Sequence, residues 1–451
     1  VRAAAGTGGR ASVDAAGLQV GDDGALHLGE VGPGVAREGR ARDDGGEHAL
    51  DDARGGGDLL APRLRVALGQ DGDEPIAELV IRLVDDIAVR RGDARVELGE
   101  DPVGGFQGVQ GGDDAVDDLV EGGLGGGQRV LVDVGLGCMG MSLVYGRPDT
   151  DSSRQAIARA IDLGITLIDT AEMYGRGSSE RLVGQALGER RDAVVLATKT
   201  GIRTMPGLGL PIGLDGRPES IRRAIDGSLE RLGTDRIDLY YLHRVDPRVP
   251  VEESIGAMAE AVAAGKILHL GVSEATSEQI RRAHATHPLA AIQMEWSLFS
   301  REIEERALDT ARELGIGVVC YSPLGRGMLT GSPSATTNLP LLDFRRFLPR
   351  WRRRNLAENL RQVEVVRQVA REAGASPAQV ALAWLLAKGD DVVPVPGTTS
   401  PNHLASNLAA TRLSLTGAQI ARLDRITAAG ERNPRWGQRA GMGQESGKKA
   451  V

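Results

Sequence analysis

The chain has 451 residues, a formal net charge of −8 and a hydrophobic content of 41%, enough for one large barrel or for two or three average domains. The net charge is negative, so nucleic acid is not an expected partner. The two cysteines, Cys138 and Cys320, are far apart and lack metal-ligand spacing. With no signal peptide and no apolar run of about 18 residues, the sequence predicts a cytoplasmic protein without a disulfide, a metal site or a membrane segment.

Residues 1–133 lack the pattern of a globular domain. Residues 1–130 contain 29 of the 62 glycines and 26 acidic against 13 basic side chains. Many glycines and few apolar side chains disfavour a dense core. We expect a low-complexity extension that is disordered or loosely structured. Translation of GC-rich DNA outside its natural frame is one possible origin, and a new acidic regulatory domain is the functional alternative.

From Val134 onward, apolar runs typical of strands alternate with amphipathic runs typical of helices. The strand candidates lie at residues 132–138, 165–171, 193–199, 236–243, 266–273, 289–296, 316–322 and 391–397. Alternation of this kind indicates a parallel sheet, and eight units over roughly 300 residues favour closure. The sequence therefore predicts an α/β fold, a (β/α)8 TIM barrel over residues 134–430, followed by a tail at 431–451.

Polar side chains follow several of these strand candidates, where the chemistry of such barrels is found. Asp169 ends the second strand, Lys199 the third and His243 the fourth, while Tyr174 lies in the loop after Asp169. Each alone has an ordinary interpretation, as a helix cap, a surface lysine or a structural histidine. Together on one rim, these four side chains supply the acidic and basic groups that a proton-transfer site needs.

The phenol explains why a lysine stands at position 199 in a chain with only five lysines. Tyrosine titrates near 10, and a neighbouring ammonium stabilises the phenolate. A compact point charge does this where a planar guanidinium would not. A carboxylate beside the lysine holds it in place, and a histidine near the phenol orients a carbonyl.

The chain resembles the aldo/keto reductase superfamily over about residues 134–428. The motifs that carry the resemblance are IDTAEMYG, LATKTG, DLYYLHR, GVSEA, IQMEWSLFSR, YSPLGRG and PGTT. GLGCMGMS and FRRFLPRWRRRNLAEN are similar to the branch of perakine reductase and the auxin-induced-protein-like reductases.

The resemblance implies an NADP(H)-dependent reductase of small-molecule aldehydes or ketones, with Tyr174 as general acid, Lys199 and Asp169 tuning its pKa, and His243 orienting substrate. It also implies that Ser273 and Gln293 bind the carboxamide of the cofactor and that Tyr321 lies against the nicotinamide ring. Ser322, Leu324 and Arg326 would contact the pyrophosphate. The 2′-phosphate region would be held by Gly397, Thr398, Thr399, His403 and Asn407.

Departures from the family pattern leave alternatives open. PGTTSPNHLASN has no lysine or arginine, so NAD is not excluded as cofactor. Glu274 stands where much of the superfamily has asparagine, and the match ends near Val134 and again after Gly430. A Schiff-base lyase acting through Lys199 and a nicotinamide-binding regulatory subunit without turnover are the rival functions. The substrate and the oligomeric state stay open.

Overall fold

The computed structural model describes residues 12–13, 18–20, 26–28, 134–142, 144–145, 149–205, 211–340 and 343–434. The chain divides into two units, Val1–Gln110 and Gly111–Val451. In the first unit, β1 (Ser12–Val13), β2 (Leu18–Val20) and β3 (Leu26–Leu28) form an antiparallel sheet, which was not predicted. The extension expected over residues 1–133 otherwise lies outside the described residues.

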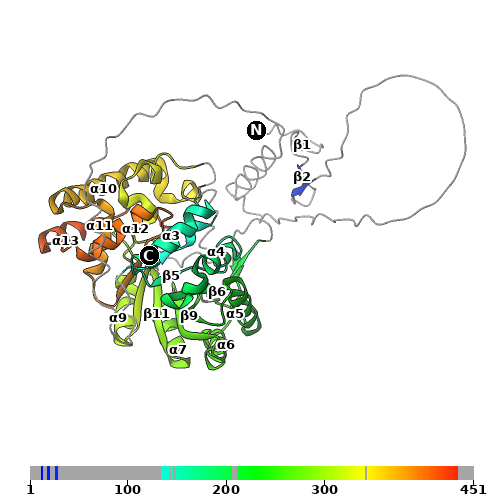
Figure 1. Cartoon of the computed structure of the whole chain (residues 1–451). Coiled ribbons are helices and arrows are strands. Elements are labelled where there is room, and N and C mark those ends of the chain that lie inside the picture. The colour runs from blue at the N-terminus through cyan, green and yellow to red at the C-terminus, as the bar shows by residue number, and fades with distance from the viewer. Residues whose placement is uncertain are drawn as a thin grey trace, which may run out of the picture. The chain divides into compact units, whose positions relative to one another are not determined.

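The second unit contains an eight-stranded parallel barrel, which confirms the predicted fold class (Figure 1). Its strands are β4 (Leu136–Gly137), β5 (Leu167–Asp169), β6 (Val195–Thr200), β9 (Ile237–Leu242), β10 (Ile267–Ser273), β11 (Leu289–Glu295), β12 (Gly317–Tyr321) and β13 (Val392–Val395). The ring closes between β4 and β13, where the Gly135 and Gly137 amides donate to the carbonyls of Pro394 and Pro396 at 2.9 and 3.2 Å. Each strand candidate of the sequence corresponds to one of these strands.

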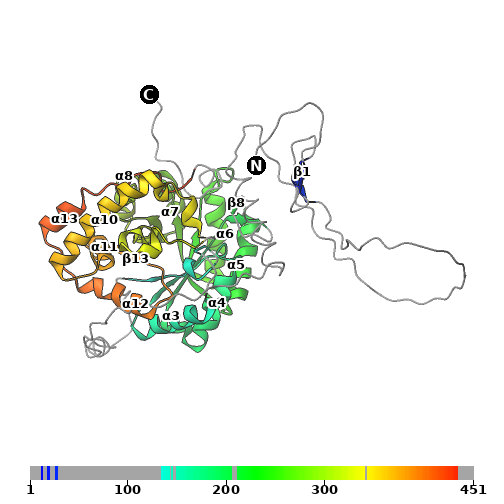
Figure 2. The ribbon, with the colours of Figure 1, turned by 90° about the horizontal axis from the view of Figure 1, so that it is seen from above.

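Helices surround the strands in the view from above (Figure 2). They are α3 (Thr150–Asp162), α4 (Ser178–Leu187), α5 (Pro218–Leu232), α6 (Val251–Ala263), α7 (Ser277–Thr286), α8 (Ile303–Arg306), α9 (Leu308–Glu313), α10 (Arg353–Ala373), α11 (Pro377–Leu386), α12 (Pro401–Leu408) and α13 (Gly417–Leu423). Short 3-10 segments are η1 (Met139–Met141), η2 (Gly188–Ala193), η3 (Gly325–Thr330), η4 (Pro333–Ala335), η5 (Phe344–Phe347), η6 (Pro349–Trp351) and η7 (Ala409–Arg412). The helices α7, α11 and α13 begin with capping boxes, which satisfy the first amides of each helix.

A hairpin of β7 (Ile202–Thr204) and β8 (Pro211–Leu214) follows β6. The sequence analysis did not predict it, because the segment is short and rich in glycine and proline and gives no clear alternation.

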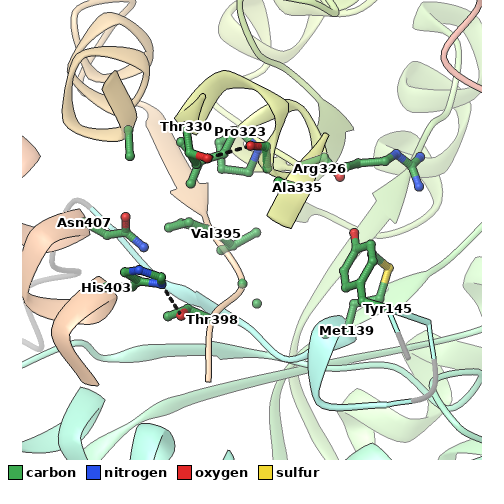
Figure 3. A pocket seen from close by; sticks show the side chains of 18 of the residues that line it. Met139, Tyr145, Pro323, Arg326, Thr330, Ala335, Val395, Thr398, His403 and Asn407 are labelled. Carbon is green, nitrogen blue, oxygen red and sulfur yellow. Dashed lines mark hydrogen bonds between the residues drawn. The ribbon is translucent and has the colours of Figure 1, made fainter. Parts of the chain in front are cut away.

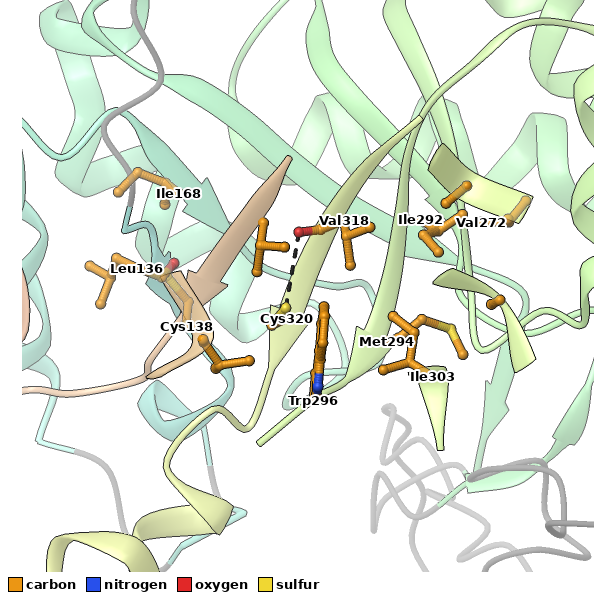
Figure 4. Packing of buried hydrophobic residues seen from close by; sticks show 14 of the residues in the cluster. Leu136, Cys138, Ile168, Val272, Ile292, Met294, Trp296, Ile303, Val318 and Cys320 are labelled. Carbon is orange, nitrogen blue, oxygen red and sulfur yellow. Dashed lines mark hydrogen bonds between the residues drawn. The ribbon is translucent and has the colours of Figure 1, made fainter. Parts of the chain in front are cut away.

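Side chains on the barrel strands alternate between the ring interior and the surrounding helices, as the two-residue period of a strand requires. The interior cluster comprises Leu167, Ala197, Leu239, Tyr241, Ala291, Val319 and Val395. The residues between them face outward, and Figure 4 shows Ile168, Ile292 and Val318 in the apolar layer against the helices. The register places every second residue of a strand inside the ring, and this decides which polar residues reach the mouth.

Candidate active site

Six of the predicted site residues lie two positions beyond an interior residue of their strand. Asp169 follows Leu167 in this way, Lys199 follows Ala197, and Tyr321 follows Val319. His243, Ser273 and Gln293 stand in the same relation to residues 241, 271 and 291. Because parallel strands end at the same rim, the strand period alone brings these six side chains to one mouth.

Lys199 is the buried cation of this rim, with no exposed surface. Its Nζ donates to Asp169 Oδ1 at 2.6 Å and to the Thr170 carbonyl at 2.7 Å. Gln293 Nε2 donates to the other oxygen of Asp169 at 2.8 Å. Burial lowers the pKa of Lys199, and Asp169 opposes that effect. The pair is therefore fixed on both sides by hydrogen bonds that leave neither charge uncompensated.

Tyr174 lies beside this pair, with Lys199 Nζ 5.3 Å from the centre of its ring. Burial raises the pKa of Tyr174 far above its ordinary value, Asp169 acts in the same direction, and Arg244 opposes them. The direction is opposite to the one expected from the lysine alone, because burial, the largest effect, and the Asp169 charge both disfavour the phenolate. The phenol accordingly stays protonated at neutral pH, which is the form that donates a proton.

His243 meets the Tyr174 ring edge-on, with ring centres 6.0 Å apart and an interplanar angle of 82°. Burial lowers the pKa of His243 well below its usual range, and the charges of Arg244 and Lys199 add to this effect. The imidazole is therefore neutral. Its Nδ1 is buried and has no hydrogen-bond partner among the described residues.

A cavity of about 510 Å³ opens beside these groups (Figure 3). The predicted residues that line it are Asp169, Tyr174, Tyr321, Ser322, Leu324, Arg326, Gly397, Thr398, His403 and Asn407. Lys199, His243 and Gln293 do not line it but contact residues that do. Ser273 Oγ accepts from Arg244 Nη1 at 3.0 Å, and Thr399 follows Thr398 without lining the cavity.

One end of the cavity lies at the start of α12. The Ser400 side chain caps this helix by accepting from the His403 amide at 3.4 Å, and Thr398 Oγ1 lies 3.5 Å from His403 Nδ1. Figure 3 shows Thr398, His403 and Asn407 together on this side, with Arg326 across the cavity and its guanidinium directed away from them. The positive end of a helix dipole suits an anion.

Two glycines leave bare backbone in the wall of the cavity. A Cβ on Gly137 would lie 2.7 Å from the Val395 carbonyl oxygen, and one on Gly397 would lie 2.9 Å from the Gly137 carbonyl oxygen. Together with the Tyr321 ring, the hydroxyl and amide of Ser273 and Gln293, and the α12 start, this donor set fits an extended dinucleotide. Of these residues, Gly137, Gly397 and Tyr321 line the cavity directly.

Several residues of the mouth were not predicted. Arg244 follows His243 directly and was passed over, although it influences the pKa of both Tyr174 and His243. Tyr145 lines the cavity, and Glu295 at the end of β11 binds Arg326 at 3.4 Å. Position at a strand end could have indicated Glu295. No local signal marks Arg432, which lies beyond the barrel helices.

The described ranges contain neither a membrane-spanning helix nor a cluster of metal-ligating side chains. Each helix there is too short or too polar to cross a bilayer. The same residues contain no group of three or more His, Cys, Asp or Glu side chains that could hold a metal ion.

A profile of the aldo/keto reductase family matches residues 133–428. A glycerol dehydrogenase from Gluconobacter oxydans is 33% identical, with a TM-score of 0.60 over 65% of this chain and 90% of that one. An aldo-keto reductase from Bacillus halodurans, solved in its holo form, is 28% identical, with a TM-score of 0.54 over 66% and 93%. An aldo/keto reductase from Klebsiella pneumoniae, solved with NADP and acetate, is 29% identical, with a TM-score of 0.52 over 67% and 94%. The aldo/keto reductases as a family use NADP(H).

Proposed function

Because the chain belongs to the aldo/keto reductase family, we propose that it is an NADP(H)-dependent oxidoreductase that reduces aldehydes or ketones to alcohols. The observation that carries the proposal is the contact of Tyr174 with Lys199 of the Lys199–Asp169 pair and with His243, where Tyr174 and Asp169 line one cavity. The branch of the family stays a prediction, as does the cytoplasmic location, which the two free and separate cysteines favour.

The residues proposed to hold the cofactor span the cavity. Ser273 and Gln293 would bind the carboxamide, Tyr321 the face of the nicotinamide, and the start of α12 with Thr398 the phosphate of the adenosine. When bound, NADPH supplies the hydride that the carbonyl carbon receives. Arg326 now hydrogen-bonds within the protein, to Glu295 and Asn433, so its predicted contact with the pyrophosphate requires its side chain to move.

We propose that the protein's part in the chemistry is to supply the proton that the carbonyl oxygen receives. Tyr174 would donate its hydroxyl proton to the carbonyl oxygen, which becomes the hydroxyl of the alcohol and leaves a phenolate. Arg244 opposes the rise in the pKa of that phenol, and the Lys199 ammonium lies 5.3 Å from the ring centre, so both positive charges would stabilise the phenolate as it forms. His243 is neutral and can hydrogen-bond the same oxygen, which would orient the carbonyl.

The rival functions receive less support. A Schiff-base lyase needs a lysine that can reach a carbonyl, whereas Lys199 has no exposed surface and gives hydrogen bonds to Asp169 and Thr170. A nicotinamide-binding subunit without turnover would not need a phenol, an ion pair and an imidazole held together.

The test compares wild type with Tyr174→Phe on a panel of aromatic and aliphatic aldehydes and glyceraldehyde, the last because of the glycerol dehydrogenase relative. We expect kcat to fall by about 10²–10⁴-fold, as for loss of a general acid, while the Kd of NADPH stays within about twofold because the ring is retained. Consumption of NADPH and of NADH is followed by absorbance, and cofactor binding by fluorescence.

Tyr240→Phe is the matched control, because Tyr240 lies on the same barrel but faces the outer apolar layer. Its kcat should equal that of wild type. Full activity in Tyr174→Phe, or tight NADPH binding by a wild type that reduces none of the panel, would contradict the proposed function.

A further inference from the structure

A short C-terminal segment, residues 429–433 and here called the strap, is fastened to the mouth of the barrel. Asn359 of α10 holds its first residue on both sides, accepting from the Ala429 amide at 2.7 Å and donating to the Ala429 carbonyl at 3.1 Å. Arg432 and Asn433 are only 9% and 3% exposed. The barrel contacts therefore continue past residue 430, where the sequence analysis placed the start of the tail.

Arg432 reaches the end of β10, where it forms an ion pair with Glu274. Its Nη1 donates to Glu274 Oε1 at 2.9 Å, and its Nη2 bonds the second carboxylate oxygen. Burial alone would raise the pKa of Glu274, but Arg432 outweighs it and holds that pKa at about 2. Glu274 directly follows Ser273, the residue proposed to bind the carboxamide.

The same carboxylate also holds Tyr321. Glu274 Oε1 accepts from the Tyr321 hydroxyl at 3.0 Å and from the Glu295 amide at 3.0 Å. A continuous chain of contacts thus runs from the strap through Glu274 to the ring proposed to lie against the nicotinamide.

The backbone at this point is strained. Glu274 has a φ of +54°, a region that residues with a Cβ rarely adopt and that costs roughly 1–3 kcal/mol. Ser322 and Arg326, which follow β12, also have positive φ, at +50° and +55°. Strain of this kind persists where surrounding contacts fix it, and at Glu274 those contacts come from Arg432, Tyr321 and the Glu295 amide.

The strap has a second contact with the proposed pyrophosphate loop. Asn433 Oδ1 accepts from Arg326 Nη2 at 3.2 Å, and Glu295 Oε2 lies 3.4 Å from the same nitrogen. Arg350 Nη1 and Arg432 Nη1 lie 3.6 and 3.9 Å from the Glu295 carboxylate. Two buried arginines and the half-buried Arg326 thus meet two buried glutamates at the edge of a cavity that the proposed function assigns to an anionic cofactor.

We propose that Arg432 is a positioning residue of the cofactor site, which acts through Glu274 on Tyr321 and so on the affinity for NADPH. The inference rests on the proposed function for the identity of the cofactor. Because Tyr321 would hold the nicotinamide equally before and during the reaction, Arg432 controls cofactor affinity rather than the rate of the bound complex.

The first experiment measures NADPH binding by fluorescence and steady-state kinetics on Arg432→Met in the full chain. We expect the Kd and the KM for NADPH to rise about tenfold, the loss of one charged hydrogen-bonded contact, with kcat within about twofold. Arg422→Met is the matched control, because Arg422 on α13 forms a partly exposed ion pair with Glu372 on α10. A Kd in Arg432→Met equal to that of the control, with only the Tm lowered, would overturn the proposal.

A second set of variants tests the route through Tyr321. Tyr321→Phe keeps the ring but removes the hydroxyl that donates to Glu274, so it should also raise the Kd. Adding Arg432→Met to Tyr321→Phe should then have a smaller effect than it has alone, since coupled residues are not additive. Full additivity would overturn the relay.

Two further variants keep the test decisive if Arg432→Met folds poorly. Arg432→Lys retains the charge and should bind NADPH more tightly than Arg432→Met, and Glu274→Gln/Arg432→Met removes the uncompensated carboxylate and should fold. A double variant that folds and binds NADPH as wild type does would refute a positioning role.

Failure of this inference can be told apart from failure of the proposed function. Wild type that binds NADPH but reduces no carbonyl contradicts the proposed function alone, whereas wild type that binds no NADPH contradicts both the proposed function and the positioning role of Arg432.

Discussion

The Lys199–Asp169 ion pair differs from other ion pairs of the chain in its burial and not in the distance between its charged atoms. Lys266 makes an ion pair with Asp226 at 2.6 Å, the same separation as between Lys199 and Asp169. The side chains of the Lys266–Asp226 pair are 45% and 61% exposed, and those of the Lys199–Asp169 pair 0% and 5%. Exposed charges lose much of their attraction to solvent screening, whereas a buried charge depends on its partner. Identical geometry therefore implies different consequences for stability and for the pKa of nearby groups.

These two lysines provide a paired prediction. Lys199→Met leaves the Asp169 carboxylate buried without its cation and should lower the free energy of unfolding by about 3–5 kcal/mol. Lys266→Met should lower it by no more than about 1 kcal/mol. Urea unfolding measures both, and Asp169→Asn/Lys199→Met should recover part of the loss. Equal losses in the two single variants would contradict the importance of burial.

At the scale of single elements, β9 and β10 fit together through one glycine. A Cβ on Gly271 would lie 2.5 Å from the Tyr241 ring and 2.7 Å from the Ala291 carbonyl oxygen. Tyr241 belongs to the interior layer below the site, with its ring centre 5.9 Å from Lys199 Nζ. The absence of a side chain at position 271 thus allows a large aromatic ring to support the buried ammonium.

Gly271→Ala should therefore displace the Tyr241 ring or the β11 backbone. Overpacking of this kind costs about 1–3 kcal/mol, and we expect a lower Tm together with reduced kcat. Gly256→Ala on α6 is the control, since no atom lies within 4 Å of its added Cβ. Removing a glycine from a helix interior should stabilise the protein by about 0.5–1 kcal/mol. Calorimetry distinguishes the two, and a stabilised Gly271→Ala would contradict the packing argument.

The stability of the whole molecule should depend on pH, because folding buries His243 in its neutral form. Its pKa in the folded protein lies well below the ordinary 6.5, so the unfolded chain binds a proton that the folded chain does not. Stability from this group is complete above pH 6.5 and is lost as the pH falls below it. Glu274, with a folded pKa of about 2 against an ordinary 4.5, adds a loss between pH 4.5 and 2.

The free energy of unfolding should accordingly fall between pH 7 and 5 by up to about 1.4 kcal/mol per pH unit. His243→Gln should flatten this part of the curve, whereas His269→Gln, an exposed position on β10, should leave it unchanged. Denaturant titrations at several pH values measure the slopes, and an unchanged slope in His243→Gln would refute the assignment.

Local pattern was sufficient to predict the barrel and the strand ends, because strand and helix periods are encoded in neighbouring residues. Asp169, Lys199 and His243 could be placed at one rim since parallel strands end together. The pKa direction of Tyr174 could not be predicted, because it depends on burial and on how closely Asp169 approaches Lys199. Arg432 was missed for a related reason: its partner Glu274 is 158 residues away in sequence, and no local pattern indicates such a pairing.

The two-residue alternation of the barrel strands also limits how such a sequence can diverge. One amino acid inserted inside β6, between Ala197 and Lys199, would rotate the ammonium from the ring to the helix side and carry the following residues with it. The same insertion in a connecting loop would leave every inward position untouched. Length is therefore free to vary between the strands but not within them, and the spacing inside each strand is as much part of the chemistry as the identity of its last residue.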